Sequence, residues 1–506
     1  MSTFIPWSAA LKTIAGQFAD LEAVSDGEHD LSFRALVGRA SAVAERLLNI
    51  GIKPGEPVAT FLRNGLAAVW ASYGITISGA AEASLNPALT RDERRYCVNL
   101  AGIKGVVTTA EEAPFFQSLG CETFAIETLG DPWGDAASIP PVDGKAWGRI
   151  IFTSGTTGRP KAIVHTHDGR WLANLLQQAS LPIAPAPGIR VLLMTPFTHG
   201  ASLTAYAYLD KGAGIVLLDG VDLPKVERAL AAGVDHVFAP PTVLAKLVSA
   251  FEGRRFSDVR LIFCGTSTLT PTLYRRARAI FGPTIRVTYG KSEIVNPITV
   301  MPAAAADRYY TEEIAGDGTC VGWPASGVEV EIRRVDGARC ALDEVGEVQL
   351  RARHMLGGDL DERGFHPQAP HGHHATGDLG RIDSQGRLHL VGRVADVIKS
   401  GGYKIYPEEI ERVLAETATA VVVTILPSEY WGEVIVAVAE NAPPGWEAAA
   451  SSAVTTLAKY KWPRAYVSVE RLPRNPQGKV PRAKVREIIL ARYTLADGPR
   501  PTLVRR

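Results

Sequence analysis

The sequence contains little cysteine. Five cysteines are spread over 506 residues, at positions 97, 121, 264, 320 and 340, and no two of them form a CxxC pair. Scattered single thiols argue against a disulfide framework and against a cysteine-based zinc site, and they are typical of a reducing compartment.

The sequence also lacks an excess of charge and a long apolar run. Lys and Arg number 54 against 53 Asp and Glu, so no general field attracts nucleic acid or an anionic membrane. No apolar run approaches the roughly 20 residues of a membrane span, and the first residues lack the pattern of a secretory signal. We therefore expect a cytoplasmic protein without nucleic-acid or membrane partners.

The length of the chain and its pattern of apolar segments indicate more than one domain. Apolar strands alternate with helical patterns, which is typical of βαβ units and a mostly parallel sheet. We expect helices at 30–51, 66–78 and 90–100, the first of them with Ser32 as its N-cap. We expect strands at 58–62, 105–108, 191–194, 215–218, 236–239, 259–264 and 285–289. From residue 327 the pattern changes to short alternating strands, which predicts a small β subdomain.

The predicted fold class is α/β. A large N-terminal domain over 1–391 holds the mostly parallel sheets and the β subdomain, 392–396 form a hinge, and 397–506 form a smaller, mobile α+β domain. We expect the tail from residue 494 onward to be loose.

One stretch, at 150–167, organises the rest. The apolar residues Ile150, Ile151 and Phe152 predict a buried strand, and a loop rich in glycine and hydroxyl groups follows them. Such a loop offers backbone N–H groups, hydroxyl donors and one cation to a triphosphate. The residues concerned are Thr153, Ser154, Gly155, Thr156, Thr157, Gly158 and Lys161. It is not a Walker loop, because Arg-Pro-Lys-Ala follows the second glycine. A surface loop that binds no ligand would have a similar composition of glycine, serine and threonine.

Further candidate residues follow later strands. Glu293 is a candidate Mg²⁺ ligand, because hard cations take carboxylate oxygens, and it lies in the string Tyr289-Gly290-Lys291-Ser292-Glu293. Tyr289 offers a ring for adenine to stack on, and Gly265, Thr266 and Ser267 offer backbone near the purine edge. Asp378 can bind both ribose hydroxyls, with Arg393 as a second ribose or phosphate contact. Asp378 is the last residue of the triplet Thr376-Gly377-Asp378, and such a triplet taken by itself is equally typical of a turn.

Together these blocks resemble the adenylate-forming superfamily of acyl-CoA synthetases, aryl-CoA ligases, peptide-synthetase adenylation domains and beetle luciferases. The matched strings are TSGTTGRPK, PFTHG, YGKSE, TGD, GRVADVIKSGGYKIYPEEIE and PRNPQGK, in the family's order. Ala162 departs from the glycine that the family usually has there. The resemblance implies that Lys479 is the catalytic lysine, acting with Glu293 and Thr153, and that Asp396 is the hinge residue. It also implies that a strip at 399–403 lines the tunnel for pantetheine. The strip consists of Lys399, Ser400, Gly401, Gly402 and Tyr403.

The resemblance further implies ATP, Mg²⁺ and coenzyme A as cofactors and a small carboxylic acid as substrate, in a monomer or homodimer. No carrier module follows Lys479, which favours free coenzyme A, although a separate carrier protein could also be the acceptor. The sequence leaves two further functions open, a luciferase-like oxygenase and a non-catalytic nucleotide-binding module.

The acid itself is not specified by the sequence. His199, Gly200 and Lys291 are the candidates for the acyl pocket, and the absence of a carboxylate from 197–202 argues against an α-amino acid. Lys291 has two possible arrangements. Either its ammonium pairs with a protein carboxylate, or it meets a polar group on the substrate.

Overall fold

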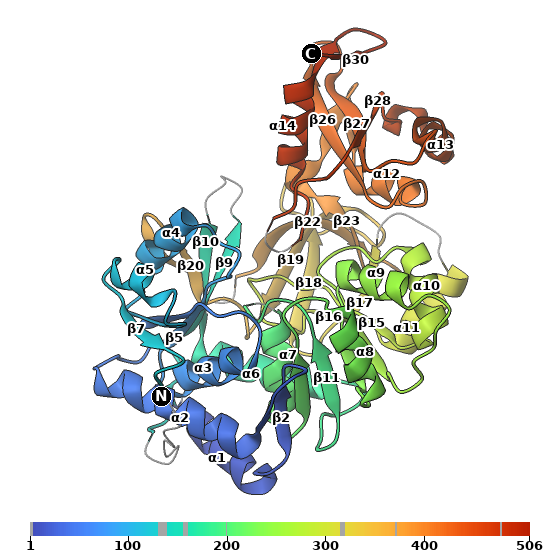
Figure 1. Ribbon diagram of the computed structural model, residues 1–506. Helices are drawn as coiled ribbons and strands as arrows, with labels where there is room; N and C mark the ends of the chain where they lie inside the picture. The colour runs from blue at the N-terminus through green and yellow to red at the C-terminus, as the bar shows by residue number, and fades with distance from the viewer. Residues whose placement is uncertain are drawn as a thin grey trace.

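The computed structural model describes residues 4–129, 139–154, 160–198, 200–313, 319–369, 372–475 and 478–506. Two mostly parallel sheets and one antiparallel sheet make up its larger, N-terminal part, and a smaller unit from the C-terminal part lies above them in Figure 1. The predicted α/β class is confirmed.

The first mostly parallel sheet contains the strand that leads into the predicted phosphate loop. Its order is β21 (Gly364–Pro367), β20 (Gly358–Asp361), β10 (Pro160–Thr166), β9 (Trp147–Ser154), β5 (Ala81–Ser84), β4 (Pro57–Thr60), β6 (Gly105–Thr108) and β7 (Glu122–Ala125). The strands from β9 to β7 pair in parallel, whereas β10, β20 and β21 extend the sheet antiparallel. At the chain's start, β1 (Phe4–Ile5) pairs with β8 (Val142–Asp143).

The second sheet is parallel except for the pair formed by β2 and β3. Its order is β15 (Ile285–Val287), β14 (Leu261–Cys264), β13 (His236–Phe238), β11 (Arg190–Leu193), β12 (Gly214–Leu217), β2 (Glu22–Ser25) and β3 (Asp30–Ser32). The third, antiparallel sheet contains the β subdomain predicted from residue 327 onward, and two strands from before that residue extend it. Its order is β16 (Thr299–Val300), β17 (Thr319–Pro324), β23 (Leu388–Arg393), β22 (His374–Ile382), β19 (Gly346–Ala352) and β18 (Val328–Arg333).

Helices cover the two mostly parallel sheets, as βαβ connections require. They are α1 (Trp7–Phe18), α2 (Phe33–Asn49), α3 (Leu66–Ile77), α4 (Arg91–Ala101), α5 (Ala113–Gln117), α6 (His167–Ser180), α7 (Gly200–Leu209), α8 (Leu223–Ala231), α9 (Pro241–Ala250), α10 (Pro271–Phe281) and α11 (Ala303–Arg308). The predicted cap of α2 is present, because the Ser32 hydroxyl accepts a hydrogen bond from the Ala35 N–H. In the described ranges, none of the helices has the length and hydropathy of a transmembrane segment.

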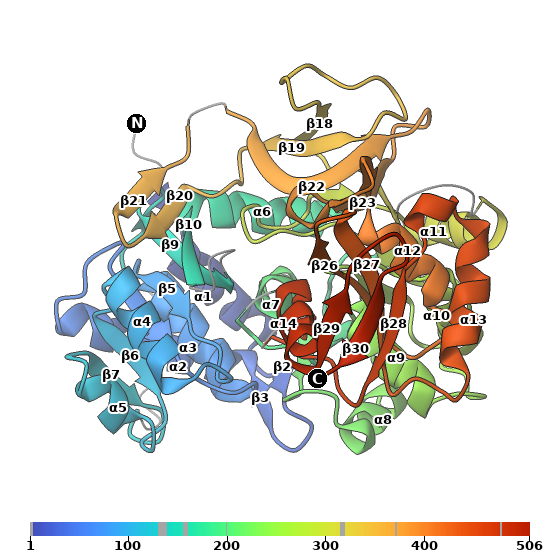
Figure 2. The same cartoon turned by 90° about the horizontal axis from the view of Figure 1, so that it is seen from above.

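The C-terminal part has its own sheet and its own apolar core. The sheet runs β25 (Tyr403–Ile405), β24 (Ile398–Ser400), β27 (Gly432–Glu440) and β26 (Val421–Ser428), and β28 (Ala465–Val469) also pairs with β27. The helices are α12 (Pro407–Leu414), α13 (Trp446–Ala453) and α14 (Arg482–Arg492). Figures 1 and 2 show α13 and α14 on opposite sides of this sheet. Its apolar clusters are built from residues 398–503, whereas those below it are built from residues 5–390.

The prediction of a loose tail is wrong. Tyr493–Ala496 (β29) and Thr502–Arg505 (β30) form an antiparallel hairpin after α14. Tyr493, Leu495 and Leu503 pack against the apolar cluster of the C-terminal sheet. The two prolines and the arginines of this segment concealed the alternating apolar positions that hold it in place.

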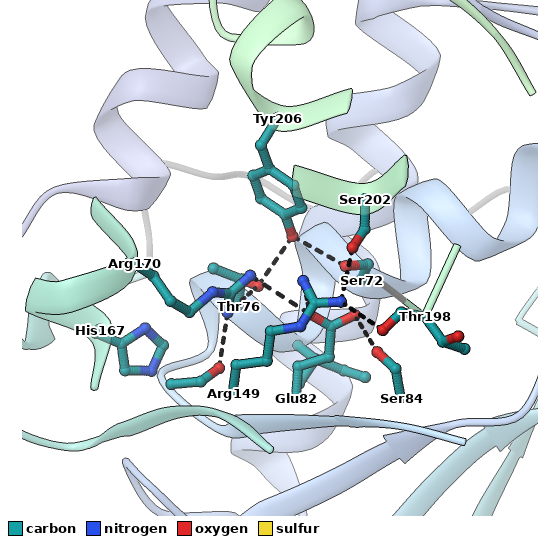
Figure 3. A network of polar contacts seen from close by, with 12 residues as sticks. Ser72, Thr76, Glu82, Ser84, Arg149, His167, Arg170, Thr198, Ser202 and Tyr206 are labelled. Carbon is teal, nitrogen blue, oxygen red and sulfur yellow. Dashed lines mark hydrogen bonds and ion pairs between the residues drawn. The ribbon is translucent and has the colours of Figure 1, made fainter. Parts of the chain in front are cut away.

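A buried polar network joins the two mostly parallel sheets (Figure 3). Glu82 of β5 pairs with Arg149 of β9 (Nη1 to Oε2, 3.7 Å) and with Arg170 of α6 (Nη2 to Oε2, 3.4 Å). The other Arg149 amino group donates to the Ser202 hydroxyl at 2.6 Å and to the Thr198 carbonyl at 3.2 Å, at the start of α7. The strand before the phosphate loop is therefore tied to α7 by a fully buried guanidinium.

Glu82→Gln is expected to destabilise the N-terminal part by about 3–5 kcal/mol, because it leaves two buried guanidinium groups without a counter-charge. Guanidinium chloride unfolding followed by tryptophan fluorescence measures this loss. Glu122→Gln, at the exposed start of β7, is the control and is expected to stay near the parent stability. Equal stability of the two variants would contradict the role given to Glu82.

Candidate functional site

The predicted phosphate loop lies between two paired strands. Thr153 at the end of β9 is opposite Lys161 of β10 in register, so the hydroxyl and the ammonium come from adjacent strands. Thr153 is half-buried and Lys161 is exposed. Gly155, Thr156, Thr157 and Gly158, and the side chain of Ser154, lie outside the described residues. The strand pair supports the predicted position of the loop at the end of a buried strand.

The Asp378 carboxylate is the centre of the site. It lies on β22 opposite Arg393 of β23, whose Nε is 3.1 Å from Oδ1. Tyr289, just after β15, donates a short hydrogen bond from its hydroxyl to Oδ2. Burial raises the pKa of Tyr289 well above its usual range, and the carboxylate raises it further, so the phenol stays a donor. Two sequence blocks, YGKSE and TGD, therefore meet at one buried carboxylate.

Lys291 and Glu293 lie beside this carboxylate. The Lys291 ammonium is 3.5 Å from Asp378 Oδ2 and donates to the Thr376 carbonyl at 2.6 Å. It is also 4.0 Å from Glu293 Oε1, and the same oxygen is 4.0 Å from His374 Nε2. Lys291 thus takes the first of its two possible arrangements, in which the ammonium pairs with protein carboxylates. Burial lowers the pKa of His374.

The backbone of the 289–293 loop is held by a residue that the sequence analysis did not single out. His165 of β10 donates from Nε2 to the Ser292 carbonyl at 2.8 Å, since a carbonyl oxygen can only accept. Burial lowers the pKa of His165 to about 4, so the ring is neutral at pH 7. His165 lies near the end of the stretch 150–167 that the sequence analysis identified, and this position was the signal available for it. It links the phosphate strands directly to Glu293's loop.

Glycine is required in the candidate purine-binding loop after β14. A Cβ on Gly265 would lie 2.6 Å from the Thr288 carbonyl oxygen, and Thr266 has a positive φ of 70°. The backbone of Gly265 therefore passes directly against the residue before Tyr289. Thr266 and Ser267 are exposed next to it. The predicted purine-edge loop and the predicted adenine platform are neighbours in space.

The segment that leads to the acyl-pocket candidates His199 and Gly200 is hydrogen-bonded to a residue that follows β4. Asn64, which the sequence analysis missed, donates from Nδ2 to the carbonyls of Thr195 and Leu218, both at 2.8 Å, and accepts from the Phe197 N–H at 2.8 Å. Gly200 begins α7, and a Cβ there would lie 3.0 Å from the Phe238 ring. His199 lies outside the described residues.

Lys479, in the C-terminal part, is within electrostatic range of this site. Restricted solvation lowers the pKa of its ammonium, and the positive charges of Arg393 and Lys291 lower it further, while Asp378 and Glu293 oppose them. Its backbone N–H donates to the Asn475 side chain at 2.9 Å. The side chain is still accessible to solvent. Residues far apart in the chain therefore share one electrostatic environment.

The predicted hinge residue is tied to the helix that follows Lys479. Asp396 accepts from Arg482 Nη1 at 2.8 Å, at the start of α14. Arg482 also pairs with Glu408 and Glu411 of α12, at 3.0 and 2.7 Å. Burial raises the pKa of Glu408 to about 7. A single guanidinium thus joins the hinge segment to two helices of the C-terminal part.

The predicted pantetheine strip, Lys399–Tyr403, forms the turn between β24 and β25. Gly401 and Gly402 both have positive φ, at 56° and 84°, which the tight turn requires. Its hydrogen-bonded neighbours are residues 431–433, and Tyr403 is stacked on Tyr460 with ring centroids 4.2 Å apart. In this conformation these contacts of the strip lie within the C-terminal part, whereas Lys479 lies within electrostatic range of the Asp378 carboxylate.

Comparison with known proteins decides the family. The sequence pattern of the family described as AMP-binding enzyme matches residues 11–358. The chain belongs to the AMP-binding enzyme family. The match includes the phosphate loop, Tyr289 and Glu293, and it ends before the TGD block and the C-terminal part.

Two curated relatives of this AMP-binding enzyme extend the likeness over nearly the whole chain. The 2-succinylbenzoate–CoA ligase of Bacillus licheniformis is 28% identical over 490 residues, covering 94% of this chain and 98% of that protein. A long-chain-fatty-acid–CoA ligase of Mycobacterium tuberculosis is 27% identical over 489 residues, covering 90% and 93%.

A solved structure confirms the fold of the AMP-binding enzyme. It is the o-succinylbenzoate CoA synthetase from Bacillus subtilis, in complex with its acyl-adenylate intermediate. The TM-score is 0.84 at 24% sequence identity, and the likeness covers 94% of this chain and 97% of that one.

Asp378→Asn is expected to weaken AMP binding by about 10- to 100-fold, because in the ribose-binding role predicted for Asp378 it loses charge-assisted hydrogen bonds to the two ribose hydroxyls. Isothermal titration calorimetry with AMP and with its 2′,3′-dideoxy analogue measures the effect. The analogue is expected to bind parent and variant with similar, weak affinity. If Asp378→Asn weakened both nucleotides equally, the carboxylate would not act on the ribose.

Proposed function

We propose that this chain is an AMP-forming acid–CoA ligase. It activates a carboxylic acid with ATP to an acyl-adenylate and pyrophosphate, and then transfers the acyl group to coenzyme A with release of AMP. The observation that carries the proposal is the buried Asp378 carboxylate, which is held by Tyr289, Arg393 and Lys291. Glu293 lies beside it, and Lys479 of the C-terminal part is within electrostatic range of both carboxylates. The activities named for both curated relatives are of this kind.

Each residue of the cluster has a task in the adenylation step. Asp378 takes the ribose hydroxyls, and Arg393 orients Asp378 and approaches the phosphates. The strand pair of Thr153 and Lys161 brings a hydroxyl and a cation to the pyrophosphate end. Lys479 draws the attacking carboxylate and the α-phosphate together, because both are anions and the charge that develops between them needs a cation.

Glu293 is the candidate Mg²⁺ ligand, and its surroundings fit that role. Its ion pairs with Lys291 and His374 are both as long as 4.0 Å, so its carboxylate is not engaged in a short contact with either of them. A single carboxylate is enough for this role, because Mg²⁺ is usually held by one or two carboxylates together with substrate phosphates and water. When bound, Mg²⁺ neutralises phosphate charge during the displacement.

We further propose that the C-terminal part, 397–506, turns about the hinge 392–396 relative to 1–391. Lys479 and the strip Lys399–Tyr403 belong to this one unit, and in the present conformation it is Lys479 that lies near the Asp378 cluster. Rotation about Asp396 brings the strip to the adenylate in place of Lys479. Gly401 and Gly402 then let the thiol arm pass close to the backbone.

The acid and the acceptor are proposed as classes only. The two curated relatives act on an aromatic acid and on long fatty acids, so the likeness supports a carboxylic acid without a basic amino group as the substrate. Coenzyme A is the proposed acceptor, with a carrier protein as the second candidate. The five cysteines are free thiols, which supports a cytoplasmic location.

The reaction is tested by its products. The protein is incubated with ATP, Mg²⁺, coenzyme A and a panel of aromatic, alicyclic and fatty acids, and nucleotides and thioesters are quantified by liquid chromatography. AMP, pyrophosphate and acyl-CoA are expected in equal amounts. Stoichiometric ADP would contradict the proposal, and oxygen consumption would indicate a luciferase-like oxygenase.

Lys479→Ala is expected to lower the adenylation rate by about 10²- to 10⁴-fold, the range for removing a preorganised electrostatic group. Supplied acyl-adenylate should still be converted to thioester at near the parent rate. Pyrophosphate exchange and single-turnover thioester formation separate the two steps. Lys484→Ala, on the exposed side of α14, is the control. Equal loss in both steps would contradict the division between Lys479 and the strip.

Lys291→Met is expected to lower kcat/KM by roughly 10-fold for every acid tested, because the ammonium pairs with Asp378 and donates to the Thr376 carbonyl. Steady-state kinetics with one plain alkyl or aryl acid and one acid carrying a distal carboxylate provide the comparison. A loss confined to the polar acid would mean that Lys291 contacts the substrate.

A further inference from the structure

The C-terminal hairpin of β29 and β30 packs on the same apolar cluster as β26 and β27, the strands next to the strip Lys399–Tyr403. Figure 1 shows this end of the chain at the end of the C-terminal part that lies away from β22 and β23. The hairpin is therefore remote from the Asp378 cluster. None of the functions assigned above uses it.

Asp497, in the turn of the hairpin, binds the turn between β26 and β27. Its Oδ1 accepts from the Ser428 hydroxyl at 2.6 Å, and its Oδ2 accepts from the Glu429 N–H at 2.6 Å and the Tyr430 N–H at 3.3 Å. The hydrogen bond from Ser428 helps to lower the pKa of Asp497, so the carboxylate is ionised at neutral pH. One exposed side chain thus holds an entire turn.

Trp431 connects that turn to the strip. Its N–H donates to the Ser428 hydroxyl at 2.9 Å, and its indole Nε1 donates to the Gly498 carbonyl of the hairpin at 3.0 Å. The Arg464 guanidinium lies over the indole, 3.5 Å from the ring centroid. The indole is therefore fixed by the hairpin on one edge and by a cation on one face.

Gly401 of the strip rests directly on Trp431. Its N–H donates to the Trp431 carbonyl at 2.9 Å, and a Cβ on Gly401 would lie 3.1 Å from the indole ring. The next pair in the ladder, Ser400 with Gly432, continues the same contact. Because Gly401 has no side chain, its backbone lies directly against Trp431. A displacement of Trp431 therefore displaces the backbone of the strip.

We propose that the hairpin, through Asp497 and Gly498, positions the strip for the thioester-forming step. The inference rests on the proposed function, because the strip is the surface assigned to the thiol arm. Asp497 is a positioning residue: it acts on Trp431 and Gly401 and touches no substrate. Adenylation uses Lys479 and the Asp378 cluster, so it does not depend on this contact.

Asp497→Ala is expected to slow thioester formation from supplied acyl-adenylate and coenzyme A by about 3- to 30-fold, the range for residues that couple two sites without touching a ligand. ATP–pyrophosphate exchange is expected to stay within about twofold of the parent. Asp497→Asn keeps one acceptor oxygen and should lose less. Thr494→Val, which alters the hairpin only at its contact with Arg506, is the matched control and should leave both steps unchanged.

Hydrogen exchange supplies a second readout on the same variants. Peptides covering 399–404 are expected to exchange faster in Asp497→Ala than in the parent or in Thr494→Val, because the Gly401 N–H loses its fixed acceptor. Unchanged thioester rates and unchanged exchange, or equal losses in both half-reactions, would overturn the inference. If the parent itself forms no thioester, the proposed function fails; if the parent does and Asp497→Ala matches it, only this inference fails.

Discussion

Two guanidinium groups and one carboxylate are buried together where β5, β9, α6 and α7 meet, and the position of the phosphate strand depends on them (Figure 3). Burial lowers the pKa of Arg149, because the charged guanidinium is removed from water, and the negative charge of Glu82 opposes this effect. Because a buried charge is tolerated only with a partner, these strands and helices cannot shift separately. Arg149 also donates to Thr198 and Ser202. The same guanidinium therefore fixes the strand before the phosphate loop and the segment around Gly200 that is a candidate for the acyl pocket.

The charged groups at the site come from both the N-terminal and the C-terminal part of the chain. Asp378 and Glu293 lie near the cations Lys291, Arg393 and Lys479, which offer positive charge to a triphosphate. The repulsion among these cations is one cause of the lowered pKa of Lys479. An anionic ligand relieves that repulsion, and its departure as pyrophosphate restores it. The charge balance of the site thus changes at the step where the C-terminal part is proposed to rotate.

The motif residues could be predicted from sequence because their chemistry is local. Glycines, hydroxyls and a lysine after an apolar strand indicate a phosphate loop, and the Ser32 cap of α2 was readable for the same reason. The partners of Lys291 could not be predicted, since they depend on β22 lying beside the 289–293 loop. Asn64, His165 and Arg149 act through long-range contacts that leave no periodic signal. The C-terminal hairpin was missed because much of its packing surface is made by β26 and β27, far earlier in the chain.

The central claim is that a substrate carboxylate attacks the α-phosphate of ATP beside Lys479. It is tested most directly by an acid labelled with ¹⁸O in its carboxylate. If an acyl-adenylate forms and coenzyme A then takes the acyl group, one labelled oxygen stays on the phosphorus of AMP. Mass spectrometry of the products is expected to find that label in AMP and none in pyrophosphate. Label in pyrophosphate or inorganic phosphate, or unlabelled AMP alongside labelled thioester, would contradict the account.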